Sequence, residues 1–268
     1  MITRPSIAVV IPAYNLEGII GHAVISALTQ TDPPDEVLVV DDGSTDATES
    51  EVRRIAEKAQ PGLVRVVRCS HHGPGASRNA GIEASCSDWV AFLDGDDTWH
   101  PEKLRLTRGA IVEQPAADMI AHDHDAVGLD GRSLYRPLHR KFDPAVPLLL
   151  QLYRGNFLAT SCLTVRSALL RQAGGFDVSL GAAQDLDLWL RLARRARLVF
   201  IPQSLQQYVL RRGSISSNVR LRHRCLIRIA YRHAPFLVAS IGRRRAFLLR
   251  LRLIAVAHYI AIDQIRQG

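Results

Sequence analysis

Residues 37–46 have the sequence Val-Leu-Val-Val-Asp-Asp-Gly-Ser-Thr-Asp, a short apolar run that ends in acidic residues. Continuous apolar character over so few residues is typical of a strand buried on both faces of a sheet. Residues 89–97, Trp-Val-Ala-Phe-Leu-Asp-Gly-Asp-Asp, have the same arrangement. Both runs therefore predict carboxylates at the carboxyl end of a buried strand, where open α/β sheets bind their ligands.

The first part of the chain alternates between predicted strands and predicted helices. Short β-rich runs lie at residues 7–11, 37–40, 64–67 and 89–93, and helical spacing or helix-start residues lie between them. This alternation predicts an α/β fold, a mostly parallel mixed sheet flanked by helices with right-handed crossovers. We expect residues 1–115 to form a nucleotide-binding half.

The pattern changes after residue 115. Looser strands are predicted at residues 119–126, 158–165, 198–201 and 207–210, with helices near Leu169 and Leu186. From Val219 the sequence has the pattern of two arginine-rich helices separated near Pro235. We therefore expect one domain over residues 1–218, in which residues 116–218 bind the acceptor, and a basic helical C-terminal extension over residues 219–268.

The net charge of +8 is concentrated towards the C-terminus, where Asp263 is the only acidic residue after Asp187. Arginines of this kind are explained by a phosphate-bearing partner or by solvated helix faces. Three roles of the extension stay open: contact with an anionic membrane surface, a cap packed on the domain, and a dimer contact. The arginines near its end are spread around a helical wheel; they are Arg243, Arg245, Arg250 and Arg252.

Composition and patterning argue against several other classes of protein. With 268 residues and 47% hydrophobic residues the chain can bury a large core, so we do not expect disorder. Its four cysteines include no Cys-x-x-Cys pair for zinc. No apolar stretch has the ~20 residues of a membrane span, and we find no signal-peptide cleavage site. We expect a cytoplasmic protein, with peripheral association at the inner face of the plasma membrane left open.

Asp94 and Asp96 are separated by one glycine, a spacing that suits two carboxylates sharing a divalent cation with nucleotide phosphates. Gly95 would let the backbone approach such a ligand closely. Oxygen ligands of this kind suit manganese or magnesium. Taken alone, the pair is also compatible with a polar turn before the helix that begins near Pro101.

Five motifs occur in a fixed order, and the last of them precedes Gln184-Asp185. Together they resemble family 2 glycosyltransferases over roughly residues 5–215. The resemblance implies a GT-A fold, which binds a nucleotide-diphospho-sugar, and inverting transfer of the sugar. The motifs are Val10-Ile11-Pro12-Ala13-Tyr14-Asn15, Val40-Asp41-Asp42-Gly43-Ser44-Thr45-Asp46, Ala76-Ser77-Arg78-Asn79-Ala80-Gly81, Phe92-Leu93-Asp94-Gly95-Asp96-Asp97 and Gly174-Gly175-Phe176-Asp177.

The resemblance also implies roles for the residues that would hold the donor. Pro12 and Tyr14 correspond to residues beside the nucleobase. Asp42 is similar to the aspartate that hydrogen-bonds the base, which is compatible with uridine. Arg78 lies where the family contacts the nucleotide and its diphosphate.

The resemblance implies that Asp96 binds the metal, that Asp94 is its partner near the ribose and sugar, and that Asp185 is the general base. These roles agree with the chemistry, because an attacking hydroxyl must lose its proton to a carboxylate opposite the leaving diphosphate. A metal would neutralise charge that develops on the departing group. Without the resemblance, a helix cap would be the commoner role for Asp185.

Two positions depart from the family's pattern. Gln184 stands where the family usually has glutamate, so the residue beside the base is a neutral amide. Arg211 or Arg212 stands where a histidine often completes the metal site; arginine does not bind metals, but Arg211 would be able to hold the diphosphate. Cation dependence weaker than usual is therefore expected.

The leading hypothesis is an inverting, non-processive glycosyltransferase that moves one sugar from a nucleotide-diphospho-sugar to a hydroxyl of a cell-envelope glycan or a lipid-linked acceptor. The absence of a Gln-x-x-Arg-Trp motif argues against a processive synthase. A catalytically silent nucleotide-sugar binder or regulatory subunit is the alternative that Gln184 and the missing histidine suggest. Nucleic-acid binding by the arginine-rich end is disfavoured, because no aromatic platform or recognition helix is evident.

Overall fold

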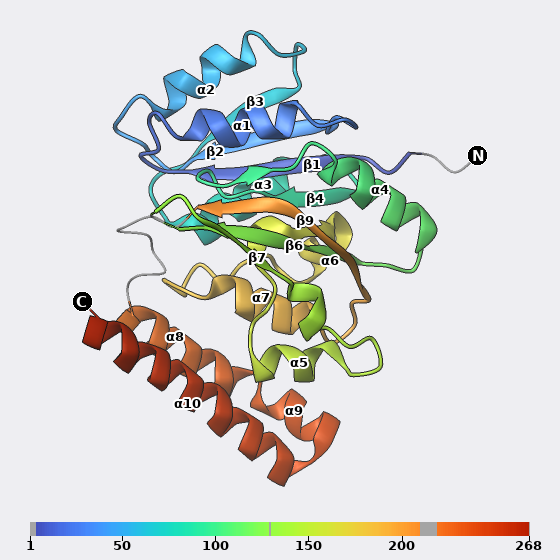
Figure 1. Ribbon diagram of the computed structural model, residues 1–268, viewed down its shortest axis with the longest axis vertical. Helices are drawn as coiled ribbons and strands as arrows, with labels where there is room; N and C mark the ends of the chain where they lie inside the picture. Colours follow the sequence, from blue (N-terminus) through green and yellow to red (C-terminus); the bar gives the residue numbers. More distant parts are fainter. Residues whose placement is uncertain (1–3, 129, 210–218, 268) are drawn as a thin grey trace.

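The computed structural model describes residues 4–128, 130–209 and 219–267. Within these residues, nine strands form one sheet in the order β3-β2-β1-β4-β8-β6-β9-β5, and β7 pairs with β6 beside this path. Helices cover both faces of the sheet, and the three last helices form a separate layer at one end of the molecule (Figure 1). The predicted mixed α/β sheet is confirmed.

The first four strands are parallel, as predicted, because each is followed by a helix that returns the chain to the same end of the sheet. β1 lies between β2 and β4, and all seven of its residues are buried, as expected for an apolar central strand. The elements are β1 (Ile7–Ala13), α1 (Ile20–Leu28), β2 (Glu36–Asp41), α2 (Thr48–Ala56), β3 (Val64–Arg68), α3 (Pro74–Ala84) and β4 (Trp89–Phe92).

The strands of the second half are mostly antiparallel to their neighbours. β8 (Leu163–Arg166) runs antiparallel to β4 and to β6 (Met119–Val127). The two strands predicted at residues 198–201 and 207–210 are one strand, β9 (Leu198–Val209), paired with β6. Pro202 interrupts its apolar pattern and coincides with a bulge, since His122 pairs with Ile201 but Asp123 pairs with Ser204.

Several elements have weak sequence signals and were not predicted. β5 has only two residues, and all four residues of β7 are exposed. Of the strand predicted at residues 158–165, only the end forms β8, because residues 160–162 form the 3-10 helix η2. The helices predicted near Leu169 and Leu186 are present. The remaining elements are β5 (Thr98–Trp99), α4 (Lys103–Glu113), β7 (Ser133–Arg136), η1 (Leu138–Lys141), α5 (Leu148–Arg154), η2 (Thr160–Cys162), α6 (Ser167–Gln172) and α7 (Gln184–Leu192).

The C-terminal extension forms three helices rather than the two predicted: α8 (Val219–Arg232), α9 (Ala234–Ile241) and α10 (Arg243–Gln267). Pro235 lies in the first turn of α9, where its missing N–H costs nothing. The additional break is at Gly242, whose φ of 78° ends α9 in a conformation that favours glycine. None of the helices in the described part of the chain is long and apolar enough to cross a membrane.

The extension packs on the rest of the molecule. Ile229, Leu237 and Leu253 are buried in the same hydrophobic core as Trp189 of α7. The cap that the sequence left open is therefore present, while the outward face of the extension remains available. The boundary near residue 218 stays a prediction.

A buried ion-pair cluster fixes this packing. Asp187 of α7 has no exposed surface and accepts hydrogen bonds from Arg191 (3.0 Å), Arg232 (2.9 Å) and His233 Nε2 (2.9 Å). His233 Nδ1 lies 3.2 Å from the Arg194 guanidinium and accepts from it, so Nε2 carries the proton that Asp187 receives. These donors hold the pKa of Asp187 at about 2, although burial opposes them. Two helices of the extension are thus tied to the helix that begins at Gln184.

Candidate active site

An aromatic pair lies at the carboxyl end of β1. Tyr14 follows the buried Pro12 and is 43% exposed. Its ring stacks on His71, with 4.1 Å between centroids and 29° between planes. His71 was not predicted, because the loop before α3 has no signal of its own. The pair offers a flat surface to a planar ligand such as a nucleobase.

Asp42 lies beside this pair and organises the same loop. Its Oδ1 accepts from the His72 backbone N–H (3.0 Å) and its Oδ2 accepts from the Gly73 N–H (2.8 Å). His71 Nδ1 is 3.3 Å from Oδ2. Each carboxylate oxygen has more than one lone pair, so Asp42 can hold the loop and still accept from a ligand. The two predicted base contacts, Tyr14 and Asp42, therefore share His71 as a neighbour.

Arg78 and Asp94, predicted separately as donor contacts, form an ion pair. The Arg78 guanidinium is 2.5 Å from Asp94 Oδ1 and lies over the Phe176 ring at 5.5 Å from its centroid. Arg78 is only 8% exposed, and its Nε is buried without a hydrogen-bond partner. A buried guanidinium with an unused N–H group is suited to an anionic ligand.

Gly95 joins the acidic cluster to the end of β1. A Cβ at this position would lie 2.9 Å from the Pro12 carbonyl oxygen and 2.6 Å from Leu16 Cδ1, so only glycine fits. The close approach places the loop between Asp94 and Asp96 against the segment that carries Tyr14. Five predicted donor residues, Pro12, Tyr14, Asp42, Arg78 and Asp94, thus lie at one end of the sheet.

Asp97, the third acid of the cluster, is buried and has a structural role that was not predicted. Its Oδ2 accepts from the Ser161 hydroxyl (2.8 Å) and the Gln206 amide (2.6 Å). Ser161 Oγ in turn accepts from the Asp94 backbone N–H (3.0 Å). Burial, followed by repulsion from Asp94, raises the pKa of Asp97 well above its ordinary value. This network fixes the backbone that carries the candidate metal ligands.

The metal site at Asp94 and Asp96 stays a prediction. Among the described residues, no group of three or more His, Cys, Asp and Glu side chains is arranged to hold an ion. Asp94 and Asp96 offer two hard oxygen donors, and magnesium sites commonly combine one or two carboxylates with substrate phosphates. The donor set therefore fits a cation that arrives with a diphosphate. Arg211 lies outside the described residues.

Asp185 lies in the first turn of α7, whose N-cap residue, Ala183, has a left-handed backbone with φ of 57°. Asp185 Oδ2 accepts from the Asn156 side-chain amide at 3.1 Å. Burial raises the pKa of Asp185, while the Leu186 N–H and then the charges of Arg78 and Arg222 oppose this shift. Arg78 thus acts on Asp185 as well as on Asp94, and Arg222 comes from the extension.

A second contact holds the two halves of the site together. The Asn79 amide group of α3 donates to the Phe176 carbonyl (2.9 Å) and accepts from the Phe176 N–H (2.7 Å). A Cβ at Gly75 would contact Gln184 Cγ at 3.6 Å, so the start of α3 lies against the start of α7. The third and fifth sequence motifs therefore meet, and they bring Asp185 to the side of Arg78.

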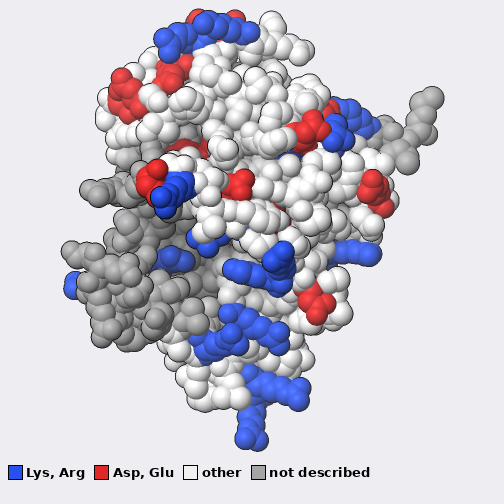
Figure 2. All heavy atoms as spheres, viewed as in Figure 1, with Lys and Arg blue, Asp and Glu red and all other residues white. Residues whose placement is uncertain are grey.

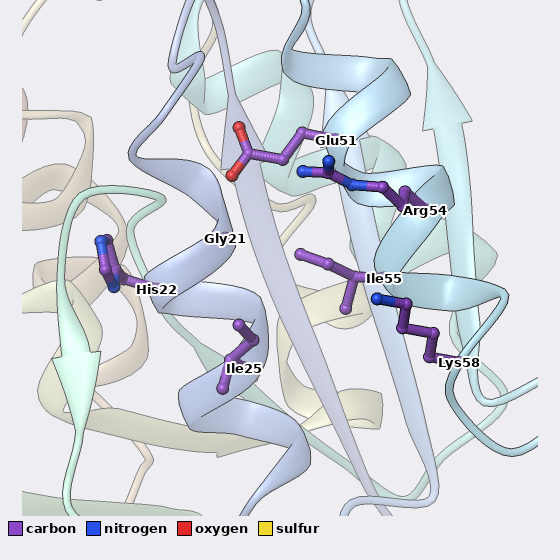
Figure 3. A pocket seen from close by; sticks show the side chains of 7 residues that line it. All are labelled: Gly21, His22, Ile25, Glu51, Arg54, Ile55 and Lys58. Atoms are coloured by element: carbon purple, nitrogen blue, oxygen red, sulfur yellow. The ribbon is translucent and has the colours of Figure 1, made fainter.

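A groove of about 260 Å³ lies elsewhere, between α1 and α2 (Figure 3). Glu51 closes one end of it by accepting from the Gly18 N–H at 2.8 Å. None of its lining residues was predicted to bind the donor, and we assign it no part in the site. They are Gly21, His22, Ile25, Glu51, Arg54, Ile55 and Lys58.

Comparison with known proteins agrees with this arrangement. The family model described as "Glycosyl transferase family 2" matches residues 8–171, more than half of the chain. The chain belongs to glycosyl transferase family 2. The resemblance drawn from the motifs is therefore confirmed.

Two curated relatives are similar along much of this family 2 chain. The succinoglycan biosynthesis protein ExoO of Rhizobium meliloti (strain 1021) is 36% identical over 232 residues, covering 82% of this chain and 65% of ExoO. TuaG of Bacillus subtilis (strain 168), named as a teichuronic acid biosynthesis glycosyltransferase, is 29% identical over 221 residues, covering 80% of this chain and 83% of TuaG. The chain thus spans less than two thirds of the length of ExoO.

A solved structure confirms the GT-A fold of this family 2 chain. The crystal structure of S. aureus TarS 1-349 in complex with UDP-GlcNAc superposes with a TM-score of 0.70 at 25% identity. The match covers 84% of this chain and 66% of that one. A second TarS 1-349 structure, in complex with UDP, has a TM-score of 0.65 at 24% identity and covers 90% of this chain and 73% of that one.

Proposed function

We propose that the chain is an inverting, non-processive glycosyltransferase that moves one sugar from a nucleotide-diphospho-sugar to an acceptor hydroxyl. The observation that carries the proposal is that α3 pairs Arg78 with Asp94 on the donor side while its first turn lies against Gln184, the residue before the candidate base Asp185. A UDP-sugar is the favoured donor, since TarS was crystallised with UDP-GlcNAc. The names of ExoO and TuaG support an acceptor that is a cell-envelope glycan or a lipid-linked precursor.

In this proposal the base of the donor lies on the Tyr14–His71 pair, and Asp42 accepts its hydrogen bond. The diphosphate lies by Arg78, whose unpartnered Nε–H is available to a phosphate oxygen. Asp94 and Asp96 would hold a manganese or magnesium ion, which when bound offsets the negative charge of the leaving diphosphate. Arg211 is proposed as a second guanidinium for the diphosphate.

Asp185 is the proposed general base. Its raised pKa makes it a stronger proton acceptor than an ordinary aspartate. The Asn156 amide orients Oδ2, and the carboxylate oxygens keep further lone pairs to receive the acceptor's proton. Gln184 carries no charge. The groups that lower the pKa of Asp185 against burial therefore include Arg78, Arg222 and Asn156.

The test is donor hydrolysis and transfer with UDP-, GDP- and dTDP-sugars, in the presence of manganese, magnesium or a chelator. We expect one nucleotide to be released in a cation-dependent way, and Asp96→Asn to reduce the rate on the order of 10²–10³-fold. Asp88→Asn is the control, because Asp88 lies outside the motifs and bonds Ser6 on the surface. Unchanged turnover in Asp96→Asn would contradict the proposed mechanism.

The second candidate function is a silent nucleotide-sugar binder, which the neutral Gln184 beside Asp185 favours. It predicts nucleotide binding in the wild type with no turnover on any acceptor, and no gain of turnover in Gln184→Glu. Peripheral association with the inner face of the plasma membrane is also part of the proposal, and the C-terminal extension would mediate it.

A further inference from the structure

The exposed face of α10 has an apolar stripe near the start of the helix. Phe247, Leu248 and Leu251 are 50%, 58% and 44% exposed, whereas Ala246 and Leu253 of the same helix are buried. Positions separated by three or four residues share one helix face, so the three exposed side chains are neighbours. An exposed cluster of large apolar residues is uncommon on a protein surface without a partner.

Arginines border this stripe. Arg244 lies one turn before Leu248 on the same face, and Arg245 and Arg252, seven residues apart, follow one side of it; all three are exposed. Arg250 is different, because its guanidinium lies over the Tyr231 ring (4.7 Å) and the Phe247 ring (5.4 Å). The arginines that the sequence spreads around the helical wheel therefore differ in the structure. Arg250 packs on two rings, whereas Arg244, Arg245 and Arg252 are exposed.

The charge of the extension is almost wholly positive. Residues 219–268 hold eleven arginines and one acidic residue, Asp263. The other 218 residues hold 23 basic and 25 acidic residues, so the extension accounts for the positive charge of the chain. On the face shown in Figure 2, Lys and Arg gather over the helices at the bottom, whereas both signs are interspersed over the top.

We propose that the stripe of Phe247, Leu248 and Leu251, with its flanking arginines, docks on the surface of an anionic phospholipid bilayer. Exposed apolar side chains bordered by cationic ones are the pattern of a helix that lies in the membrane interface. The apolar side chains enter the headgroup boundary while Arg244, Arg245 and Arg252 contact lipid phosphates. This inference rests on the membrane association proposed above, and it names the surface and the lipid class.

Two other occupants fit less well. A symmetric contact with a second copy would bring two sets of arginines together, and like charges oppose such a contact. Nucleic acid would be met by arginines but would leave the three large apolar side chains without a partner. The combination of the two side-chain types on one face therefore favours lipid.

The test is sedimentation of the full chain with vesicles of phosphatidylcholine alone, or with part of it replaced by phosphatidylglycerol. We expect binding only to the anionic vesicles, weakened by salt. Arg244→Gln, Arg245→Gln and Arg252→Gln should each weaken it about fivefold, as expected for an arginine near an anionic surface. The matched controls are exposed arginines of the other helices and strands, Arg53→Gln, Arg65→Gln and Arg105→Gln, which should have no effect.

The apolar contribution has its own variant and its own control. The triple variant Phe247→Ser, Leu248→Ser, Leu251→Ser should lose at least tenfold in vesicle binding, while Val112→Ser, Leu134→Ser, Val178→Ser, at equally exposed apolar positions, should bind as the wild type does. Circular dichroism checks that both triple variants fold. Wild-type vesicle binding by the first triple variant would overturn the inference. So would tighter binding of the wild type to RNA than to the anionic vesicles. A wild-type dimer that dissociates in the first triple variant but not in the second would overturn it as well.

Donor hydrolysis separates this inference from the proposed function. The stripe lies outside the donor site, so we expect both triple variants to hydrolyse the donor at the wild-type rate. Loss of vesicle binding with hydrolysis retained supports the docking surface. Hydrolysis in a wild type that does not bind anionic vesicles would overturn the docking surface alone.

Discussion

The donor side and the acceptor side of the proposed site are held in place by different kinds of contact. On the donor side, Asp42 accepts from two backbone N–H groups of the loop that opens α3. On the acceptor side, Asp185 has one side-chain amide, and its helix is fixed through Asp187 to the C-terminal extension. The donor side is thus built at the ends of strands, whereas the acceptor side depends on the three C-terminal helices.

The largest effect on stability is expected at Asp187, which attaches the acceptor side to the C-terminal extension. Asp187→Asn removes the buried charge that Arg191, Arg232 and His233 share, and it should lower the free energy of unfolding by about 3 kcal/mol. The stabilisation by Asp187 is fully present above its ordinary pKa of 3.8 and is lost as the pH falls towards 2. Urea unfolding at pH 7 and at lower pH measures both effects. Glu102→Gln, in a surface pair, is the control, and equal stability of Asp187→Asn and the wild type would contradict the comparison.

The donor side should respond in affinity rather than in stability. Arg78→Gln leaves Asp94 without its partner and removes the guanidinium proposed to meet the diphosphate, so UDP binding should weaken by about 2 kcal/mol, or roughly thirtyfold. Isothermal titration with UDP measures this change. Arg65→Gln, on the exposed part of β3, should bind as the wild type does. Wild-type affinity in a folded Arg78→Gln would remove Arg78 from the donor site.

A pH profile of transfer should distinguish the proposed base from the structural acid beside it. Asp185 must be ionised to accept a proton, so the rate should fall about tenfold per pH unit once the pH is below its pKa. Because that pKa is raised, the fall should begin above 3.8, while Asp187 is still ionised and the fold intact. Initial rates with melting temperatures at each pH test this. A rate that falls only together with unfolding would contradict the assignment.

The smallest effect is expected at Asp97, on the donor side. Its raised pKa means that the charged form is disfavoured in the folded protein, so it costs stability increasingly as the pH rises above its ordinary value. Asp97→Asn should keep the contacts with Ser161 and Gln206 and raise the free energy of unfolding by up to about 1 kcal/mol at pH 7. Thermal unfolding measures it, and a large loss of stability would show that the network needs the charge.

The difference between the two sides also explains what the sequence could predict. β1 to β4 and their acidic ends are local patterns, in which an apolar run, a glycine and an acid lie within ten residues of each other. These local features mark the two acidic clusters and the spacing of Asp94 and Asp96. The family resemblance chose Asp42 and added Pro12, Tyr14, Arg78 and Asp185.

The contacts that were missed join residues far apart in the chain. Gln206 reaches Asp97 across 109 positions, and His233 reaches Asp187 across 46. No local pattern marks either of them, since a glutamine in a strand and a histidine between two helices have many uses. The continuation of β9 through Pro202 and the helix break at Gly242 were not predicted. The bulge in β9 depends on its pairing with β6, which no local pattern marks.

The most direct test of the central claim compares two acids that lie two residues apart on α7. Asp185→Asn should bind UDP and melt at or above the wild-type temperature, yet turn over the donor sugar on the order of 10²–10⁴-fold more slowly. Asp187→Asn should melt earlier and, where folded, turn over at close to the wild-type rate. If Asp185→Asn turned over as fast as the wild type, the two halves of the molecule would not form the proposed active site.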